Sequence, residues 1–226
     1  RRVLKTLPET TNVENKNQLK YAAIPETKLS KSPSKQVIKK QNSPSVLFAS
    51  GQYGEAIELI NINLKSNIDN HKLIFLKGRS QLMLNQYEKA VSTFLDALAI
   101  KMDSDYLNGL GYAYSKLKQP NKALAAYNKA ISINNKNSYA YFNSGLLLEN
   151  KGNKKLASNY FYSAGTSSLL NKDFLKANNA HDALQRLSKG ESVISEKSNK
   201  LGNLIKELTN DKDDDFKIIK VKSNGD

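Results

Sequence analysis

Small and aromatic residues recur along residues 43–188 at intervals of 33 or 34 positions, and several positions keep the same register. A period of this length is typical of a solenoid, in which similar supersecondary units stack on one another. Because the units bury their apolar faces against each other, residues 43–188 are predicted to form one stack. The recurring positions are Gly78, Gly111 and Gly145; Ala56, Ala90, Ala123 and Ala157; Phe94, Tyr127 and Phe161; and Ala97, Ala130 and Ala164.

Each unit is predicted to contain two helices separated by a short turn. In the third unit the first helix has an apolar face at three-to-four spacing, and Pro120 suits the start of the second helix because it lacks an N–H. The units are predicted at 43–70, 71–103, 104–137 and 138–171, followed by a capping helix at 173–188. The two faces of the third unit are Leu107, Leu110, Gly111 and Tyr114, and then Ala123, Tyr127, Ala130 and Ile131.

The two ends of the stack differ from its middle. Ser43-Pro44 is typical of a helix cap followed by a first helical residue, so a short first helix is predicted from Pro44 to Ser50. After 189, a polar stretch is expected to reach Ser198, followed by one short amphipathic helix. The acidic run DKDDD (211–215) precedes FKIIKVK (216–222), which we interpret as a strand or a docking peptide. The apolar positions of the short helix are Leu201, Leu204, Ile205 and Leu208.

These residues resemble the tetratricopeptide repeat family, whose pattern is Trp-x2-Leu-Gly-x2-Tyr, then Ala-x3-Phe, then Pro. The third unit gives Leu107-x2-Leu110-Gly111-x2-Tyr114 and then Ala123-x3-Tyr127. The chain departs from the pattern because it has no Trp, and Met102, Asn135 and Leu169 replace the final Pro. The resemblance implies an all-α fold, a right-handed α-solenoid of helix–turn–helix repeats.

The resemblance also implies a binding site. In the family, the fifth and ninth residues of each repeat line a concave groove that holds partner segments. We therefore expect a peptide or helix with apolar anchors, and an acidic residue opposite Arg79, while some of these rings could instead pack within the stack. Clamping of a chaperone's terminal carboxylate is disfavoured, because Arg79 alone fits that chemistry. The groove positions are Phe75, Arg79, Asn108, Tyr112, Phe142 and Leu146.

Charge points to an alternative function. The formal net charge is +14, and residues 1–44, which contain four of the five prolines, carry +7 of it. This segment is predicted to be a basic linker or tail (1–42), suited to nonspecific binding of nucleic acid or an anionic membrane. Sequence-specific base reading is disfavoured, because 31 of the 35 basic residues are lysines. The lysines expected to act in the tail are Lys28, Lys31, Lys35, Lys39 and Lys40.

Catalytic chemistry is not indicated. The chain has no cysteine and two histidines that lie far apart in sequence, His71 and His181. The acidic run has Phe216 where a calcium loop needs glycine, and Lys222 where it needs glutamate, so a calcium site is rejected. We predict no enzyme activity, no cofactor, no metal and no small-molecule substrate.

The leading hypothesis is therefore a non-catalytic scaffold or adaptor within a larger assembly. A tail followed by repeats resembles the layout of bacterial accessory proteins of pilus, secretion or motor assemblies. A segment preceding Arg1 that anchors or exports the chain is one expectation for its location, and the cytoplasm is the other.

Overall fold

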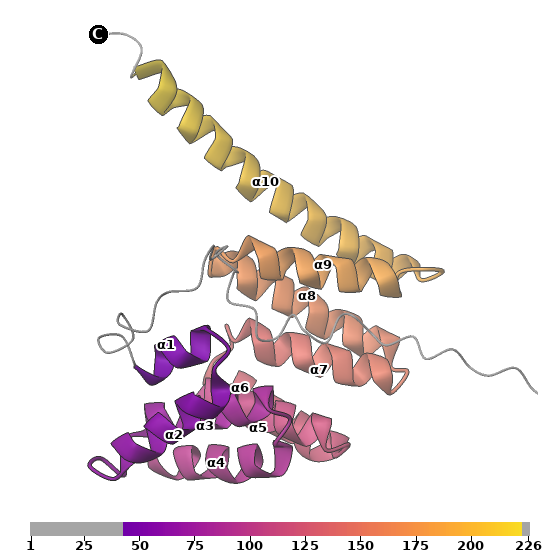
Figure 1. Cartoon of the computed structure of the whole chain (residues 1–226). Coiled ribbons are helices and arrows are strands. Elements are labelled where there is room, and N and C mark those ends of the chain that lie inside the picture. The colour runs from indigo at the N-terminus through magenta and orange to yellow at the C-terminus, as the bar shows by residue number, and fades with distance from the viewer. Residues whose placement is uncertain (1–42, 223–226) are drawn as a thin grey trace, which may run out of the picture. The chain divides into compact units, whose positions relative to one another are not determined.

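The structure, a computed structural model, describes the backbone of residues 43–222 and the side chains of residues 43–210. Residues from Ser43 onward form one compact unit, and the predicted tail, with the five lysines expected to act in it, lies outside the described residues. Among the described residues, no helix is both long and apolar enough to cross a membrane. The helices of Figure 1 are α1 (Pro44–Ala49), α2 (Tyr53–Leu64), α3 (His71–Met83), α4 (Tyr87–Ile100), α5 (Ser104–Lys116), α6 (Pro120–Ile133), α7 (Ser138–Asn150), α8 (Lys154–Leu170), α9 (Phe174–Leu187) and α10 (Ser192–Lys222).

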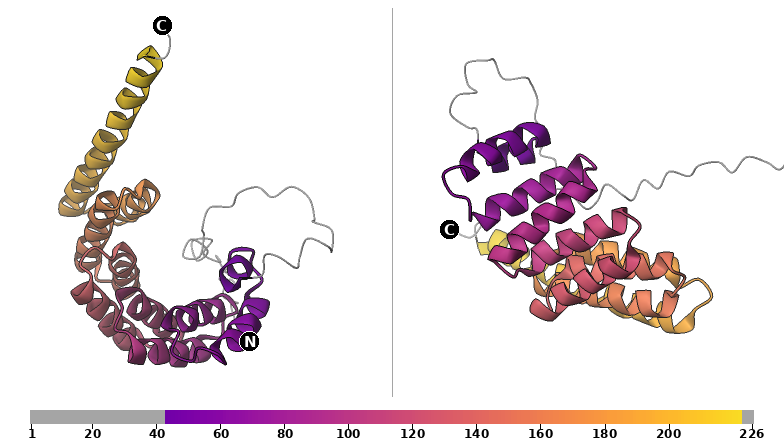
Figure 2. Two further views of the ribbon diagram at one scale, coloured as in Figure 1. Left: turned by 90° about the vertical axis from the view of Figure 1, so that its left-hand side faces the viewer. Right: turned by 90° about the horizontal axis from the view of Figure 1, so that it is seen from below.

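Helices α1 to α8 form four consecutive pairs, and each helix packs against the next. Figure 2 shows these pairs stacked in chain order. The first helices of neighbouring units also touch, α3 with α5 and α5 with α7. The prediction of an all-α solenoid of helix–turn–helix repeats is confirmed for the part of the chain that the structure describes.

The repeating glycines and aromatic residues meet inside each unit. A methyl group added to Gly111 would lie 2.6 Å from the ring of Tyr127, and one added to Gly78 would lie 2.6 Å from the ring of Phe94. Gly145 approaches Phe161 in the same way. Because the glycine has no side chain, the ring of the second helix packs directly on the backbone of the first helix. All three rings are fully or almost fully buried.

The turn inside each unit uses one residue with a left-handed backbone, at positions 51, 85, 118 and 152. Gly51 and Gly152 adopt this conformation without steric cost, whereas Asn85 and Lys118 adopt it with φ of 57° and 56°. The turns therefore keep the 33- to 34-residue period in backbone shape, although their residue types differ.

Asn137 joins the third unit to the fourth. Its side chain caps α7 by accepting a hydrogen bond from the Ala140 N–H (3.0 Å), and its amide donates to the Ser104 hydroxyl (2.7 Å) and to Asp105 (3.0 Å). Ser104 in turn donates to the carbonyl of Ala130 (2.9 Å), so both polar side chains are satisfied although they are buried.

The C-terminal end differs from the sequence prediction. The expected polar stretch is helical from Ser192, and α10 buries Ile194, Ser198, Leu201 and Ile205 against α8 and α9. The capping helix α9 is therefore itself covered by α10. Residues 216–222 continue α10, so the strand reading of FKIIKVK is wrong.

Replacing Gly111 with alanine should destabilise the fold. The added methyl group overlaps the buried Tyr127 ring, and overpacking of this kind costs about 1–3 kcal/mol, which outweighs the roughly 1 kcal/mol that alanine gains in a helix. Urea unfolding followed by circular dichroism measures the change. The control is Gly54→Ala in α2, where the added methyl group meets nothing within 4 Å. Equal stability of the two variants would contradict the packing argument.

Asn137→Ala should cost more than Asn153→Ala. Both asparagines cap a helix by accepting from the N–H three residues later, and loss of such a cap costs about 0.5–2 kcal/mol. Asn137 is also buried and joins two units, so its loss removes further hydrogen bonds worth about 0.5–1.5 kcal/mol each. Thermal unfolding of the two variants checks this order, and a larger effect at the exposed Asn153 would contradict it.

Candidate functional site

The six predicted groove residues lie on the first helices of three neighbouring units. Each helix contributes two side chains, and all six are half-buried. The three helices are neighbours, because α3 contacts α5 and α5 contacts α7, and we call the six positions together the first-helix face. It consists of Phe75 and Arg79 on α3, Asn108 and Tyr112 on α5, and Phe142 and Leu146 on α7.

Phe75 and Phe142 pack within the stack. The Phe75 ring stacks on Tyr106 of the next unit at 4.4 Å between ring centroids and touches Phe94 at 5.8 Å. Phe142 packs against Phe161 at 5.3 Å. For these two rings the alternative of packing within the stack therefore holds.

Arg79 is the charged residue of the first-helix face, and its guanidinium lies against aromatic rings. Its guanidinium lies over the Phe48 ring at 4.5 Å and near the Phe75 ring at 5.9 Å. Burial lowers the pKa of this guanidinium, while Tyr139, Asp105 and Tyr53 partly offset that effect. The ion pairs among the described residues are Lys101–Asp103, Lys176–Asp173 and Arg186–Glu149, and Arg79 belongs to none of them.

Tyr112 stands at the centre of the face on α5. Burial, with a smaller contribution from Tyr87, raises the pKa of its phenol to about 12. The Lys116 ammonium lies 5.2 Å from the centroid of the Tyr112 ring, a cation–π distance, and burial lowers the pKa of Lys116. Tyr112 and Lys116 thus form an amphipathic pair, with an aromatic surface next to a positive charge.

The other two members differ in chemistry. The side-chain oxygen of Asn108 accepts a hydrogen bond from the Asn143 amide at 2.9 Å, which joins α5 to α7. Leu146 packs at the edge of the C-terminal core and remains half-exposed.

Sequence reasoning missed Asp105, Lys116 and Tyr139, which also lie on the first helices. Asp105 and Tyr139 line a hollow of about 170 Å³, where α5, α7 and α9 begin, together with the ion pair Lys176–Asp173. The repeat spacing could have identified these residues. Asp105 and Tyr139 both occupy the second position of their repeats, and Lys116 occupies the thirteenth. These positions place a charge of each sign beside the face.

The chain resembles a known repeat family in sequence. The family model of the tetratricopeptide repeat matches residues 104–137, the third unit. A TPR repeat-containing protein of Methanocaldococcus jannaschii is 28% identical over 120 residues, which are 53% of this chain and 21% of that protein. The protein O-mannosyl-transferase TMTC3 of Homo sapiens is 30% identical over 104 residues, 45% of this chain and 11% of that protein. The chain thus spans a small part of these relatives.

Solved structures share the fold. The crystal structure of MamA matches with a TM-score of 0.58 at 15% identity, over 77% of this chain and 98% of that one. PcrH from Pseudomonas aeruginosa matches with a TM-score of 0.50 at 20% identity, over 53% and 92% of the two chains. PcrH in complex with the chaperone binding region of PopD gives 0.52 at 19% identity, over 55% and 96%. The protein is therefore an α-helical repeat protein whose third unit matches the family model of the tetratricopeptide repeat.

The half-buried phenol of Tyr112 should make the free energy of unfolding depend on pH in the alkaline range. A pKa raised from 10.0 to about 12 means that the unfolded chain loses this proton first, so the stabilising effect is complete below pH 10 and is lost as pH rises towards 12. Tyr112→Phe keeps the ring but removes the titration. Urea unfolding at pH 8 and pH 11 should therefore show a smaller loss of stability for the variant. An identical loss in both proteins would contradict the assignment.

Proposed function

We propose that this protein is a non-catalytic adaptor that holds a segment of a partner protein on the first-helix face. The observation that carries the proposal is Arg79, a half-buried cation that belongs to no ion pair among the described residues. Removing a charge from water is costly unless it is paired, so a carboxylate from a partner would complete the site. Phe48 and Phe75 hold the guanidinium in place for that contact.

The fold supports this role. PcrH shares the fold and has been captured in complex with a segment of another protein, the chaperone binding region of PopD. Repeat proteins present an extended surface on which a partner segment contacts several units at once. An adaptor of this type would act within a larger assembly.

The geometry also suggests the form of the partner segment. Arg79 and Tyr112 occupy the same position on two helices in contact, and the axes of packed helices lie about 8–10 Å apart. An extended chain spans that distance in about three residues. The favoured segment would therefore carry an acidic residue and, about three positions away, an apolar side chain that packs beside Tyr112 and Leu146.

Selection of peptides from a random displayed library on the intact chain tests the proposal. We expect enriched peptides to pair an acidic residue with an apolar residue at this spacing. Their affinity should fall at least tenfold, or about 1.4 kcal/mol, with Tyr112→Ala/Leu146→Ala. Arg79→Gln should remove the preference for the acidic residue.

The matched control truncates two exposed apolar side chains on second helices, Leu95→Ala/Ile133→Ala. Circular dichroism of each variant shows whether the fold is kept. The first-helix face is not the binding site if the selected peptides bind the face variant as tightly as they bind the control.

A further inference from the structure

Positive charge is concentrated in one part of the described unit. Residues 111–189 contain 12 basic and 3 acidic residues, whereas residues 45–110 contain 6 and 7. Two of the three acidic residues are already paired, Glu149 with Arg186 and Asp173 with Lys176, which leaves Asp182. Most lysines of this segment therefore have no carboxylate partner within it.

Five of these lysines lie at the turns inside the third and fourth units. They are exposed, and the two turns are neighbours, because the Lys151 ammonium donates a hydrogen bond to the Asn121 side chain at 3.0 Å. None of the five belongs to an ion pair among the described residues. We call Lys118, Lys122, Lys151, Lys154 and Lys155 the lysine edge.

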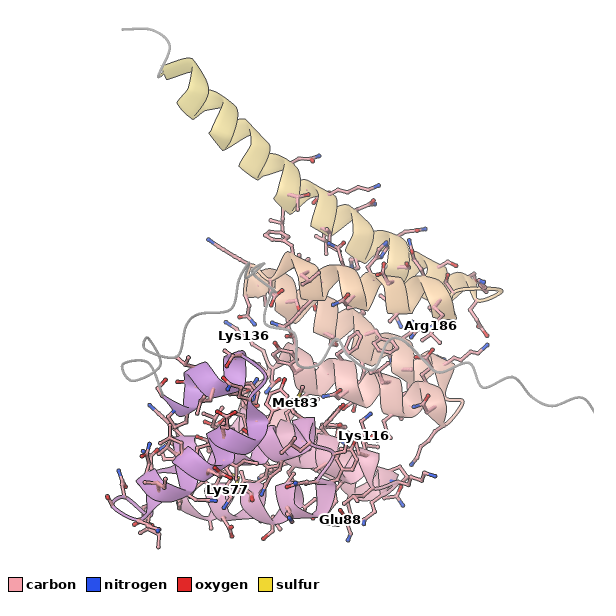
Figure 3. The ribbon with its side chains drawn as sticks, viewed as in Figure 1. Lys77, Met83, Glu88, Lys116, Lys136 and Arg186 are labelled. Atoms are coloured by element: carbon pink, nitrogen blue, oxygen red, sulfur yellow. The ribbon has the colours of Figure 1, made fainter. Side chains whose placement is uncertain are left out.

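Two contacts show that the lysine edge lies on one side of the stack. Arg186, near the end of α9, binds Glu149, near the end of α7, through two hydrogen bonds of 2.9 and 2.8 Å. Lys197, early in α10, donates a hydrogen bond to Asn159, early in α8. The ends of α7 and α9 and the starts of α8 and α10 therefore share this side. In Figure 3, Arg186 and Lys116 lie towards it, and Lys136 lies away from it.

Helix α10 carries the densest acidic run of the chain away from the lysine edge. Leu201 packs against Gly165 further along α8, so α10 runs in the same direction as α8. The run DKDDD begins at Asp211, 19 residues after Ser192, or about 28 Å along a helix. This distance is several times the Debye length of about 8 Å at physiological salt. The acidic run therefore does not reach the lysine edge of its own molecule.

We propose that the lysine edge binds residues 211–215 of a second copy of this chain. The two segments are complementary, five lysines against four aspartates and one lysine. Because the lysine edge and the acidic run are different segments, the contact is head to tail, and a complex of two copies keeps one free edge and one free run. Such a contact builds either a ring or an open chain. The five lysines are exposed, so added salt screens their attraction to the aspartates and weakens the contact.

Sedimentation velocity of the intact chain over a range of protein concentrations tests the proposal. At about 0.02 M salt the mean mass should rise with concentration, and at about 0.5 M salt it should stay that of the monomer. Lys151→Glu/Lys154→Glu/Lys155→Glu should lower the association constant at least tenfold. Two of these changes place glutamates in the first turn of α8, where the helix dipole favours them, so the fold should be kept.

The control makes the same change of charge away from the lysine edge, Lys129→Glu/Lys136→Glu/Lys172→Glu, and should lower the association much less. Asp211→Lys/Asp213→Lys/Asp215→Lys should also abolish self-association. A mixture of the edge variant and this run variant should form a complex that stops at the dimer, because one intact edge meets one intact run. A monomeric wild-type chain at low salt, or an equal loss in edge variant and control, would overturn the proposal.

Discussion

The contact between a glycine on each first helix and an aromatic ring on the following second helix determines how the units are built. Phe94, Tyr127 and Phe161 lie where a Cβ atom on the first helix would stand. Burying a ring of this size stabilises a fold by about 1.5–3 kcal/mol, and the stack repeats the contact in three units. Phe94 is also confined by Gly109 of the next unit, so one ring fixes both the pair and the stacking of its neighbour.

This packing also creates the candidate binding face. The first helices also pack against one another, α3 against α5 and α5 against α7. Their fifth and ninth side chains then line up across three units. Some of that surface is used by the stack itself, because Phe75 stacks on Tyr106 and Phe142 packs on Phe161. Arg79, Tyr112 and Leu146 are the half-buried members of the face on which the proposed contact with a partner segment depends.

The sequence predicts the fold where one residue type repeats in one structural role. The recurring glycine and aromatic positions are of this kind. The units and the packing roles of Tyr127 and Phe161 therefore follow from the 33- to 34-residue spacing. The turns are less visible, because Gly51, Asn85, Lys118 and Gly152 share a backbone conformation but not a residue type. The start of α10 was missed since its buried side includes Ser198, which does not read as an apolar position.

The candidate site could be predicted only as a list of positions. The family spacing assigns six residues to one face. It does not predict which of their rings pack within the stack. Tyr106, the stacking partner of Phe75, lies 31 residues away and is not one of the recurring positions. The electrostatic surroundings of Arg79 are equally hidden from the sequence. Asp105 and Tyr139, which both act on the pKa of Arg79, come from two other units. Such contacts follow from the stacking geometry rather than from local pattern.

The distribution of charge separates two kinds of contact on this molecule. The first-helix face offers aromatic and aliphatic surface with a partly buried cation, and burial of apolar surface is little affected by moderate salt. The lysine edge offers exposed ammonium groups, whose attraction is screened within about 8 Å at physiological salt. The two surfaces therefore respond differently to ionic strength. Under the two proposals, a rise in salt would therefore release the contact between copies of the chain before it released a segment bound to the first-helix face.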